Sequence, residues 1–177
     1  MRNAFVRACA VVALALPNAL SAQSRVFIMK LGSDTVGFER VVRTGNRIEG
    51  VIVRHIPAPS MVKYSLVLGR DGHVASFEQG SYRADGTPNA PNPRSGAATV
   101  GLKMTFVGDT VIREVPVNGK PVVRRTAVPK GTLPAIGGSW YAYELEVEAA
   151  RKGGKAYVMS FAANAPVVPD IRVITRD

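Results

Sequence analysis

Apolar and polar residues alternate along most of the chain after residue 24, in runs of strand length. Leu102, Met104 and Phe106, for example, alternate with Lys103 and Thr105. Successive side chains of a strand point to opposite faces, so this pattern predicts a strand with one buried face. The same reasoning predicts strands at 26–31, 35–43, 47–55, 63–68, 73–79, 98–107, 110–117 and 121–128, and two more at 155–161 and 171–175.

Short turn sequences separate these runs. They are Gly32-Ser33-Asp34, Thr44-Gly45-Asn46, Gly69-Arg70-Asp71-Gly72, Gly108-Asp109 and Asn118-Gly119. Glycine adopts positive φ without steric cost and Asn or Asp tolerates it, which is what tight hairpin turns require. Alternating strands joined by short turns are typical of antiparallel neighbours with one buried face. We therefore expect a mainly β protein, an up-and-down antiparallel sheet in a single domain spanning 23–177.

One segment, 80–96, breaks the alternation with three prolines and three glycines. Prolines and glycines at this density interrupt both helices and strands, so we expect a long exposed loop here. Loops of this length without secondary structure are uncommon and are usually either functional or mobile.

A second segment, 138–151 with the sequence GSWYAYELEVEAAR, fits either a strand or a helix. Its apolar residues alternate with glutamates as in a half-buried strand. Its ends, however, resemble helix ends, with Ser139 as an N-cap, Arg151 in the last turn and Gly153-Gly154 as the stop. These end signals and the Ala, Leu and Glu content favour one C-terminal helix, packed across the sheet.

The first 22 residues are typical of a secretory signal peptide. Arg2 and Arg7 precede an apolar run at 8–16, and small residues at 20–22 predict cleavage after Ala22. The apolar run is shorter than the roughly 20 residues that span a bilayer, and no later run reaches that length. We therefore expect an exported protein, periplasmic or extracellular and not membrane-spanning. Its single cysteine would leave with the signal peptide, so the mature chain would contain no disulfide.

The chain is strongly basic. Without Arg2 and Arg7, the 23 basic residues become 21 against 13 acidic ones, which leaves a net charge of +8. Such a balance favours anionic partners. Export and the absence of basic-aromatic interleaving argue against nucleic acid, so a lipid or another anionic envelope component is the expected partner.

No constellation of catalytic or metal-ligating residues is evident. His55 and His73 lack the spacing of metal ligands, and an Asp71–His73 pair is explained by a hairpin turn. Ser139 lacks the second glycine of a nucleophile elbow. The three alternate glutamates of 144–148 cannot converge on one point. We expect no enzyme activity, no metal and no cofactor.

The densest aromatic group is Trp140, Tyr141 and Tyr143. A helix covering a sheet needs large side chains, so the simplest role for these rings is to anchor the helix to the core. An alternative role is ligand binding: the rings would form the apolar wall of a pocket, with Arg124 and Arg125 at its mouth to meet an anionic headgroup.

The order of elements carries a resemblance. The predicted signal peptide comes first. It is followed by the stretch GSDTVGFERVVRTGNRIEG, by the meander, and then by Pro134 and SWYAYELEVEAAR. This order resembles that of exported bacterial half-barrel proteins, which are distantly similar to the Lol-type carriers of envelope lipoproteins. The resemblance implies a curved sheet partly plugged by a helix, with an apolar hollow between them that holds acyl chains.

Two hypotheses on function follow. In the first, the chain is an exported, noncatalytic protein that binds a hydrophobic or amphiphilic envelope molecule between sheet and helix. In the second, it is a structural or interaction protein that docks onto an envelope partner through its basic surface or a sheet edge and has no cavity. The two differ in whether the interior is hollow.

Overall fold

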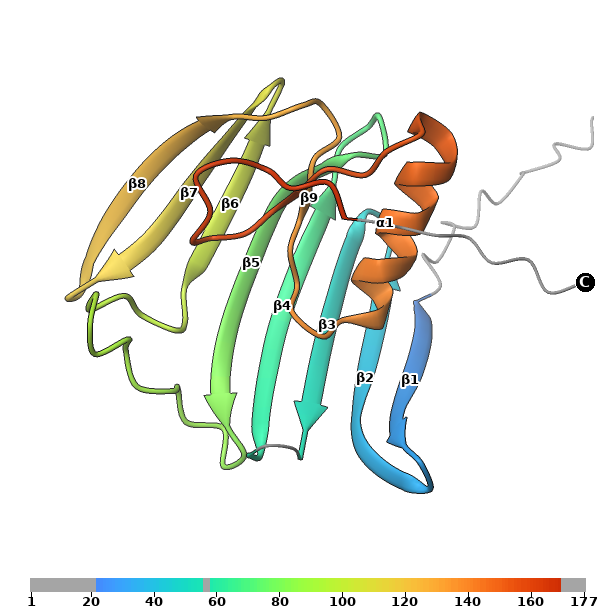
Figure 1. Cartoon of the computed structure of the whole chain (residues 1–177), viewed down its shortest axis with the longest axis vertical. Coiled ribbons are helices and arrows are strands. Elements are labelled where there is room, and N and C mark those ends of the chain that lie inside the picture. The colour runs from blue at the N-terminus through green and yellow to red at the C-terminus, as the bar shows by residue number, and fades with distance from the viewer. Residues whose placement is uncertain (1–21, 56–57, 170–177) are drawn as a thin grey trace, which may run out of the picture.

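The alternating segments form one eight-stranded antiparallel sheet in a computed structural model that describes residues 22–55 and 58–169 (Figure 1). Each strand pairs with its neighbours in sequence, so the order in the sheet is the order in the chain. The strands are β1 Gln23–Leu31, β2 Asp34–Thr44, β3 Arg47–Arg54, β4 Ser60–Leu68, β5 Val74–Arg83, β6 Leu102–Val107, β7 Thr110–Val117 and β8 Lys120–Ala127. The predicted up-and-down antiparallel sheet is confirmed.

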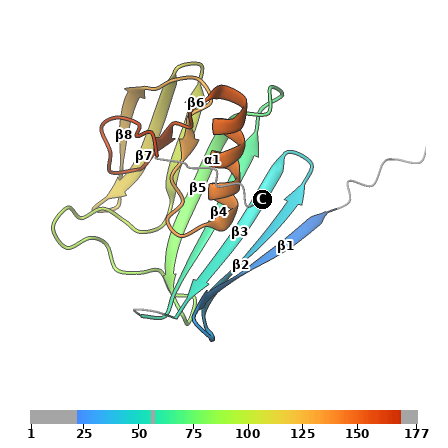
Figure 2. The same ribbon diagram turned by 45° about the vertical axis from the view of Figure 1, so that its right-hand side comes forward.

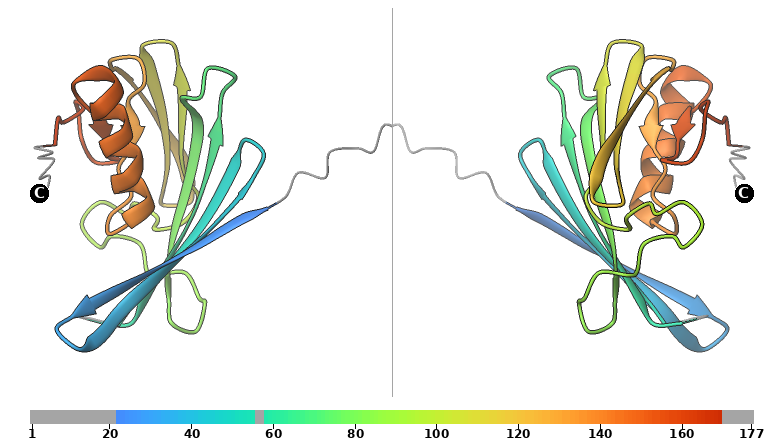
Figure 3. Two further views of the ribbon diagram at one scale, coloured as in Figure 1. Left: turned by 90° about the vertical axis from the view of Figure 1, so that its right-hand side faces the viewer. Right: turned by 90° about the vertical axis from the view of Figure 1, so that its left-hand side faces the viewer.

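Tight turns make this meander possible. Between β7 and β8, Asn118 and Gly119 have φ values of 51° and 76°. Positive φ at both central residues matches the right-handed twist of the flanking strands, which is why Asn-Gly is common in two-residue hairpins. The sheet curves and remains open, and α1 lies on one of its faces only (Figures 2 and 3). We call this the concave face.

Two boundaries on either side of the long loop differ from the sequence prediction. β5 continues to Arg83, so 80–83 belong to a strand and the loop begins later than expected. The strand predicted at 98–107 begins only at Leu102, because Gly101 has φ 71° and turns the chain out of the ladder. The backbone N–H of Ala98 instead donates to Pro116.

The segment that fitted two structures is a helix, α1 Trp140–Gly153. The Ser139 side chain accepts a hydrogen bond from the backbone N–H of Ala142, and Gly154 ends the helix in the left-handed conformation with φ 75°. These are the N-cap and C-cap that the sequence predicted. The strand alternative for this segment is wrong.

After the helix, the chain returns to the concave face. β10 Val158–Met159 pairs in parallel with β9 Leu133–Pro134. The strand predicted at 155–161 is therefore reduced to two residues, because the backbone carbonyls of Ser160 and Phe161 accept hydrogen bonds from an arginine side chain instead of a neighbouring strand. The strand predicted at 171–175 and the signal peptide predicted at 1–22, except for Ala22, lie outside the described residues.

The hydrophobic core lies between the concave face, α1 and this returning segment. Its centre contains the Phe77 ring of β5 stacked on Phe161, with centroids 5.7 Å apart. Other fully buried residues of the strands are Ile48, Ile52, Leu66, Met104 and Val111. The fold is thus a half-barrel with a helix packed across it.

In the described part of the chain, no helix is long and apolar enough to cross a membrane.

Candidate functional site

A buried carboxylate joins the helix to the sheet. Glu39 of β2 is fully buried, and its Oε1 accepts hydrogen bonds from the hydroxyls of Tyr64 at 2.7 Å and Ser139 at 2.6 Å. Its Oε2 accepts from the backbone N–H groups of Trp140 at 2.7 Å and Tyr141 at 3.1 Å. The first N–H groups of a helix lack partners within the helix and favour negative charge. Glu39 therefore caps α1 from a strand far away in sequence.

A glycine makes room for this contact. Tyr64 lies on β4 and Glu39 on β2, and Gly50 of the intervening strand β3 pairs with Tyr64. A Cβ atom at Gly50 would lie 2.0 Å from the Tyr64 ring. The ring thus crosses β3 where a side chain is missing, which allows its hydroxyl to reach the carboxylate.

The Glu39 cluster is structural rather than a reaction centre. Both Glu39 and Ser139 have no exposed surface, and each carboxylate oxygen already accepts two hydrogen bonds. Burial, and then the hydrogen bond to Glu39, raise the pKa of Tyr64, so this hydroxyl keeps its proton. The proposed role of Ser139 as a helix cap is confirmed.

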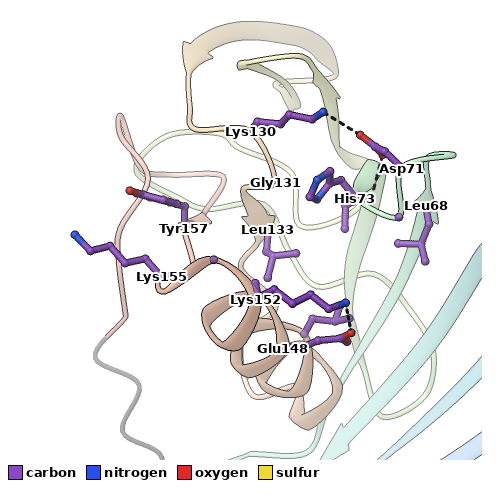
Figure 4. Close-up of a pocket in the computed structure, with 15 residues that line it drawn as sticks. Leu68, Asp71, His73, Lys130, Gly131, Leu133, Glu148, Lys152, Lys155 and Tyr157 are labelled. Atoms are coloured by element: carbon purple, nitrogen blue, oxygen red, sulfur yellow. Dashed lines mark hydrogen bonds and ion pairs between the residues drawn. The ribbon is translucent and has the colours of Figure 1, made fainter.

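The concave face has a hollow beside the C-terminal half of α1 (Figure 4). We call it the helix hollow. It measures about 440 Å³ and lies between the β4–β5 turn, residues 130–133 and the helix. Its apolar lining includes Leu68, Leu133, Leu145 and Ala149, three of which are partly buried residues that pack against the core.

Two ion pairs lie at the rim of the helix hollow. Lys130 reaches Asp71 at 3.5 Å and Lys152 reaches Glu148 at 2.6 Å (Figure 4). The backbone N–H of His73 donates to Asp71 and holds the pKa of that carboxyl below its ordinary value. The hydrogen bond from Lys152 lowers the pKa of Glu148 in the same way. Lys130 and Lys152 are thus paired within the protein, whereas Lys155, which also lines the hollow, has no ion pair among the described residues.

A second hollow lies near the opposite edge of the sheet. We call it the arginine hollow. It measures about 430 Å³, and it is lined on the sheet side by Arg113, Val115 and Val117 of β7 and by Val122 and Arg124 of β8. Phe161 and Ala162 of the returning segment and Ser95 and Ala97 of the long loop complete its wall.

Arg113 is buried next to this hollow with only 2% of its surface exposed. Its Nη1 donates to the backbone carbonyl oxygens of Phe161 at 2.9 Å, Ser160 at 3.4 Å and Ala163, and its Nη2 donates to the Thr126 hydroxyl at 2.9 Å. Its Nε has no hydrogen-bond partner among the described residues. Burial lowers the pKa of Arg113.

The ligand-binding residues proposed from the sequence do not lie together. Tyr141 is buried beside Val41 of β2, whereas Trp140 and Tyr143 are each 50% exposed and contact one another edge to face on the helix. Arg124 lines the arginine hollow on β8, the last strand of the sheet, and Arg125 follows it on the opposite face. The helix aromatics and the two arginines thus belong to different parts of the molecule. None of the three aromatic rings lines the helix hollow or the arginine hollow.

The described residues contain no assembled metal site. No group of three or more His, Cys, Asp or Glu side chains there has the geometry to hold a metal ion. His73 lies between the helix hollow and a smaller adjoining one of about 290 Å³, with Lys130 and Gly131 beside it. The expectation of a noncatalytic protein stays a prediction.

Comparison with protein-family models, curated proteins and solved structures finds no match for the chain.

Proposed function

We propose that the protein binds a hydrophobic or single-chain amphiphilic molecule in the helix hollow. The observation that carries this proposal is a hollow of about 440 Å³ between helix and sheet, with apolar side chains from Leu68, Leu133 and Leu145. Pockets for small ligands have volumes of about 300–1,000 Å³ and are mostly apolar with a few polar groups. A hollow between helix and sheet supports the first hypothesis drawn from the sequence, although none of the ligand-binding residues named there lines it.

The charges at the rim suggest what kind of ligand fits. Lys130 and Lys152 are already paired with Asp71 and Glu148, so a headgroup gains little by replacing these partners. Burial of apolar surface, at about 25 cal/mol per Å², is then the main driving force for binding. The proposal therefore requires a ligand with an apolar chain and allows headgroups of different charge.

Export is part of the same proposal. The signal-peptide pattern before residue 23 and the resemblance to half-barrel envelope carriers both support a ligand from the cell envelope. In this reading the protein holds an envelope amphiphile without changing it chemically.

The test uses the neutral fluorescent probe N-phenyl-1-naphthylamine, whose emission rises in apolar surroundings. Ala149→Phe would fill the helix hollow, whereas Ala150→Phe is a matched control because Ala150 does not line it. We expect the wild type and Ala150→Phe to bind the probe and Ala149→Phe to bind it at least about tenfold more weakly, the loss of about 1.4 kcal/mol. Equal binding by both variants, with urea midpoints unchanged, would exclude the helix hollow as the site.

A different observation favours an interaction protein as a second candidate. β1 is the first strand of the sheet and pairs only with β2 in the described residues. Val26 and Ile28 of this strand are 60% and 62% exposed. An exposed apolar edge strand presents unpaired backbone groups to which a strand of a partner protein adds.

The two candidates are separated by an edge variant. Val26→Lys with Ile28→Lys places like charges on the outer side of β1, where they oppose strand addition. If the protein acts through this edge, cross-linking to envelope proteins in the expressing cell would fall in the variant while probe binding stays unchanged. Cross-linking that is independent of these substitutions would remove the support for the second candidate.

A further inference from the structure

We propose that the arginine hollow is a second binding site, for the carboxylate headgroup of an amphiphile with a short apolar chain. Arg113 and Arg124 would hold the headgroup, and the valines of β7 and β8 would contact the chain. The proposal rests on residues that the helix hollow does not share, so it stands or fails independently of the function proposed above.

The first argument is uncompensated charge. Arg113 and Arg124 are direct cross-strand neighbours in the β7–β8 ladder. Like charges directly opposite each other destabilise a pair of strands. Among the described residues neither guanidinium has an acidic partner, in contrast to Lys130 and Lys152 at the helix hollow. A bound anion would remove this repulsion.

The second argument is an unused donor. The Nη groups of Arg113 are occupied by the carbonyl oxygens of the returning segment and by Thr126, but the Nε–H is buried and has no partner in the part of the chain that the structure describes. Buried polar groups are almost always hydrogen-bonded, so this exception calls for an explanation, of which a bound ligand or a water molecule is one. Arg124 is exposed and makes no side-chain hydrogen bond in the described residues, so its donors are also available.

The third argument is the remaining lining. Apart from Ser95 and the two arginines, the side chains that line the hollow are apolar, and they come from β7, β8, the long loop and the returning segment. A small inorganic anion would leave most of this surface in contact with water. A carboxylate accepts two parallel hydrogen bonds from a guanidinium, and an attached alkyl chain would cover the valines.

The experiment is isothermal titration of the full chain with decanoate and with decyltrimethylammonium, which has the same chain length and the opposite charge. Arg124→Gln removes one guanidinium, and Arg125→Gln removes a neighbouring one from the opposite face of β8. Charge-assisted hydrogen bonds contribute about 1.5–3 kcal/mol each, so we expect Arg124→Gln to weaken decanoate binding by about 10- to 100-fold. Arg125→Gln should change it less than about twofold, the size expected for a distant surface charge.

Two further measurements keep the result interpretable. N-phenyl-1-naphthylamine should bind Arg124→Gln as it binds the wild type, which shows that the fold and the helix hollow are intact. Ala149→Phe should retain decanoate binding. With the helix hollow filled by Ala149→Phe, the proposal is overturned if added Arg124→Gln and Arg125→Gln changes leave decanoate binding equal, or if decyltrimethylammonium binds as tightly as decanoate. It is also overturned if Ala149→Phe alone loses decanoate while Arg124→Gln alone keeps it. The last result would place the anion in the helix hollow and leave the proposed function standing.

Discussion

The concave face contains two buried charged side chains with opposite surroundings. Glu39 lies under the N-terminus of α1, and four donors from β4 and the helix start satisfy both of its oxygens. Arg113 lies under the returning segment, where carbonyl oxygens and one hydroxyl accept hydrogen bonds from it. Within residues 22–55 and 58–169 its Nε has no partner, and its cross-strand neighbour is another arginine.

This difference separates a structural charge from a candidate binding charge. A buried carboxylate with every lone pair used has nothing left to offer a ligand, and removing it would leave its donors unsatisfied. The arginine pair, in contrast, has spare donors and uncompensated charge next to a hollow of about 430 Å³. Substitutions at Glu39 should therefore cost stability, whereas substitutions at Arg124 should cost binding.

The largest effect on stability is expected for Glu39→Ala. It leaves the buried Tyr64 and Ser139 hydroxyls and two helix N–H groups without their acceptor, and each unsatisfied buried group costs about 1–3 kcal/mol. Because water reaches some of these groups after the change, we expect a total loss of about 3–5 kcal/mol in the free energy of unfolding by urea. Glu49→Ala, which breaks an exposed pair with Arg47, should cost no more than about 1 kcal/mol. Similar losses for both variants would contradict the structural role of Glu39.

A smaller loss is expected for Gly50→Ala, which tests how Tyr64 reaches the carboxylate. The new methyl group would overlap the Tyr64 ring, and such overpacking costs about 1–3 kcal/mol. Combining Gly50→Ala with Tyr64→Leu should cost less than the sum of the two single changes, because the smaller side chain leaves room for the methyl group. Additive urea denaturation free energies would show that the ring does not depend on Gly50.

Glu146 of α1 is a second buried glutamate, but unlike Glu39 its carboxylate accepts no hydrogen bond from the described residues. It is 8% exposed, and burial raises its pKa. The folded carboxyl therefore binds its proton more tightly than the unfolded one, so stability falls as the pH rises from the unfolded pKa, about 4.3, through the folded value. Glu146→Gln should raise the urea midpoint at neutral pH, and the gain should vanish below about pH 4. A gain that persists at low pH would point to another cause.

The smallest effect on stability is expected for Arg124→Gln. The substitution relieves repulsion from Arg113, so without ligand the free energy of unfolding should stay the same or rise by up to about 1 kcal/mol. Thermal unfolding in the absence of amphiphile measures this directly, with Arg125→Gln as the control. A clear loss of stability would mean that Arg124 is part of the packing, as Glu39 is.

The sequence predicts the strands and the helix well because their signals are local. Alternation gives the faces of the strands, and Ser139 and Gly154 give the ends of α1. Hydrogen bonds between residues far apart in the sequence leave no such local signal. Glu39 and Ser139 are 100 positions apart, and Arg113 and Phe161 are 48 positions apart. The signal available in the sequence was a charged residue at a core-facing position, Glu39 two residues before Val41 and Arg113 between Val111 and Val115.

Arg124 was proposed from the sequence as a ligand contact and does line a hollow, but without the aromatic rings expected beside it. The proposed grouping requires α1 to lie next to β8, the strand that contains Arg124. The helix instead lies near the first strands, because the carboxylate of Glu39 on β2 accepts hydrogen bonds from its N-terminal N–H groups. A grouping by composition could not anticipate this placement.

Native mass spectrometry of the protein purified from the periplasm of an expression host shows whether the concave face holds an amphiphile. We expect the added mass of a lipid-sized molecule that solvent extraction releases, and its loss in the combined variant Ala149→Phe and Arg124→Gln. A protein that carries no added mass, and that gains none when decanoate or N-phenyl-1-naphthylamine is supplied, would contradict the account and favour an interaction protein with a closed interior.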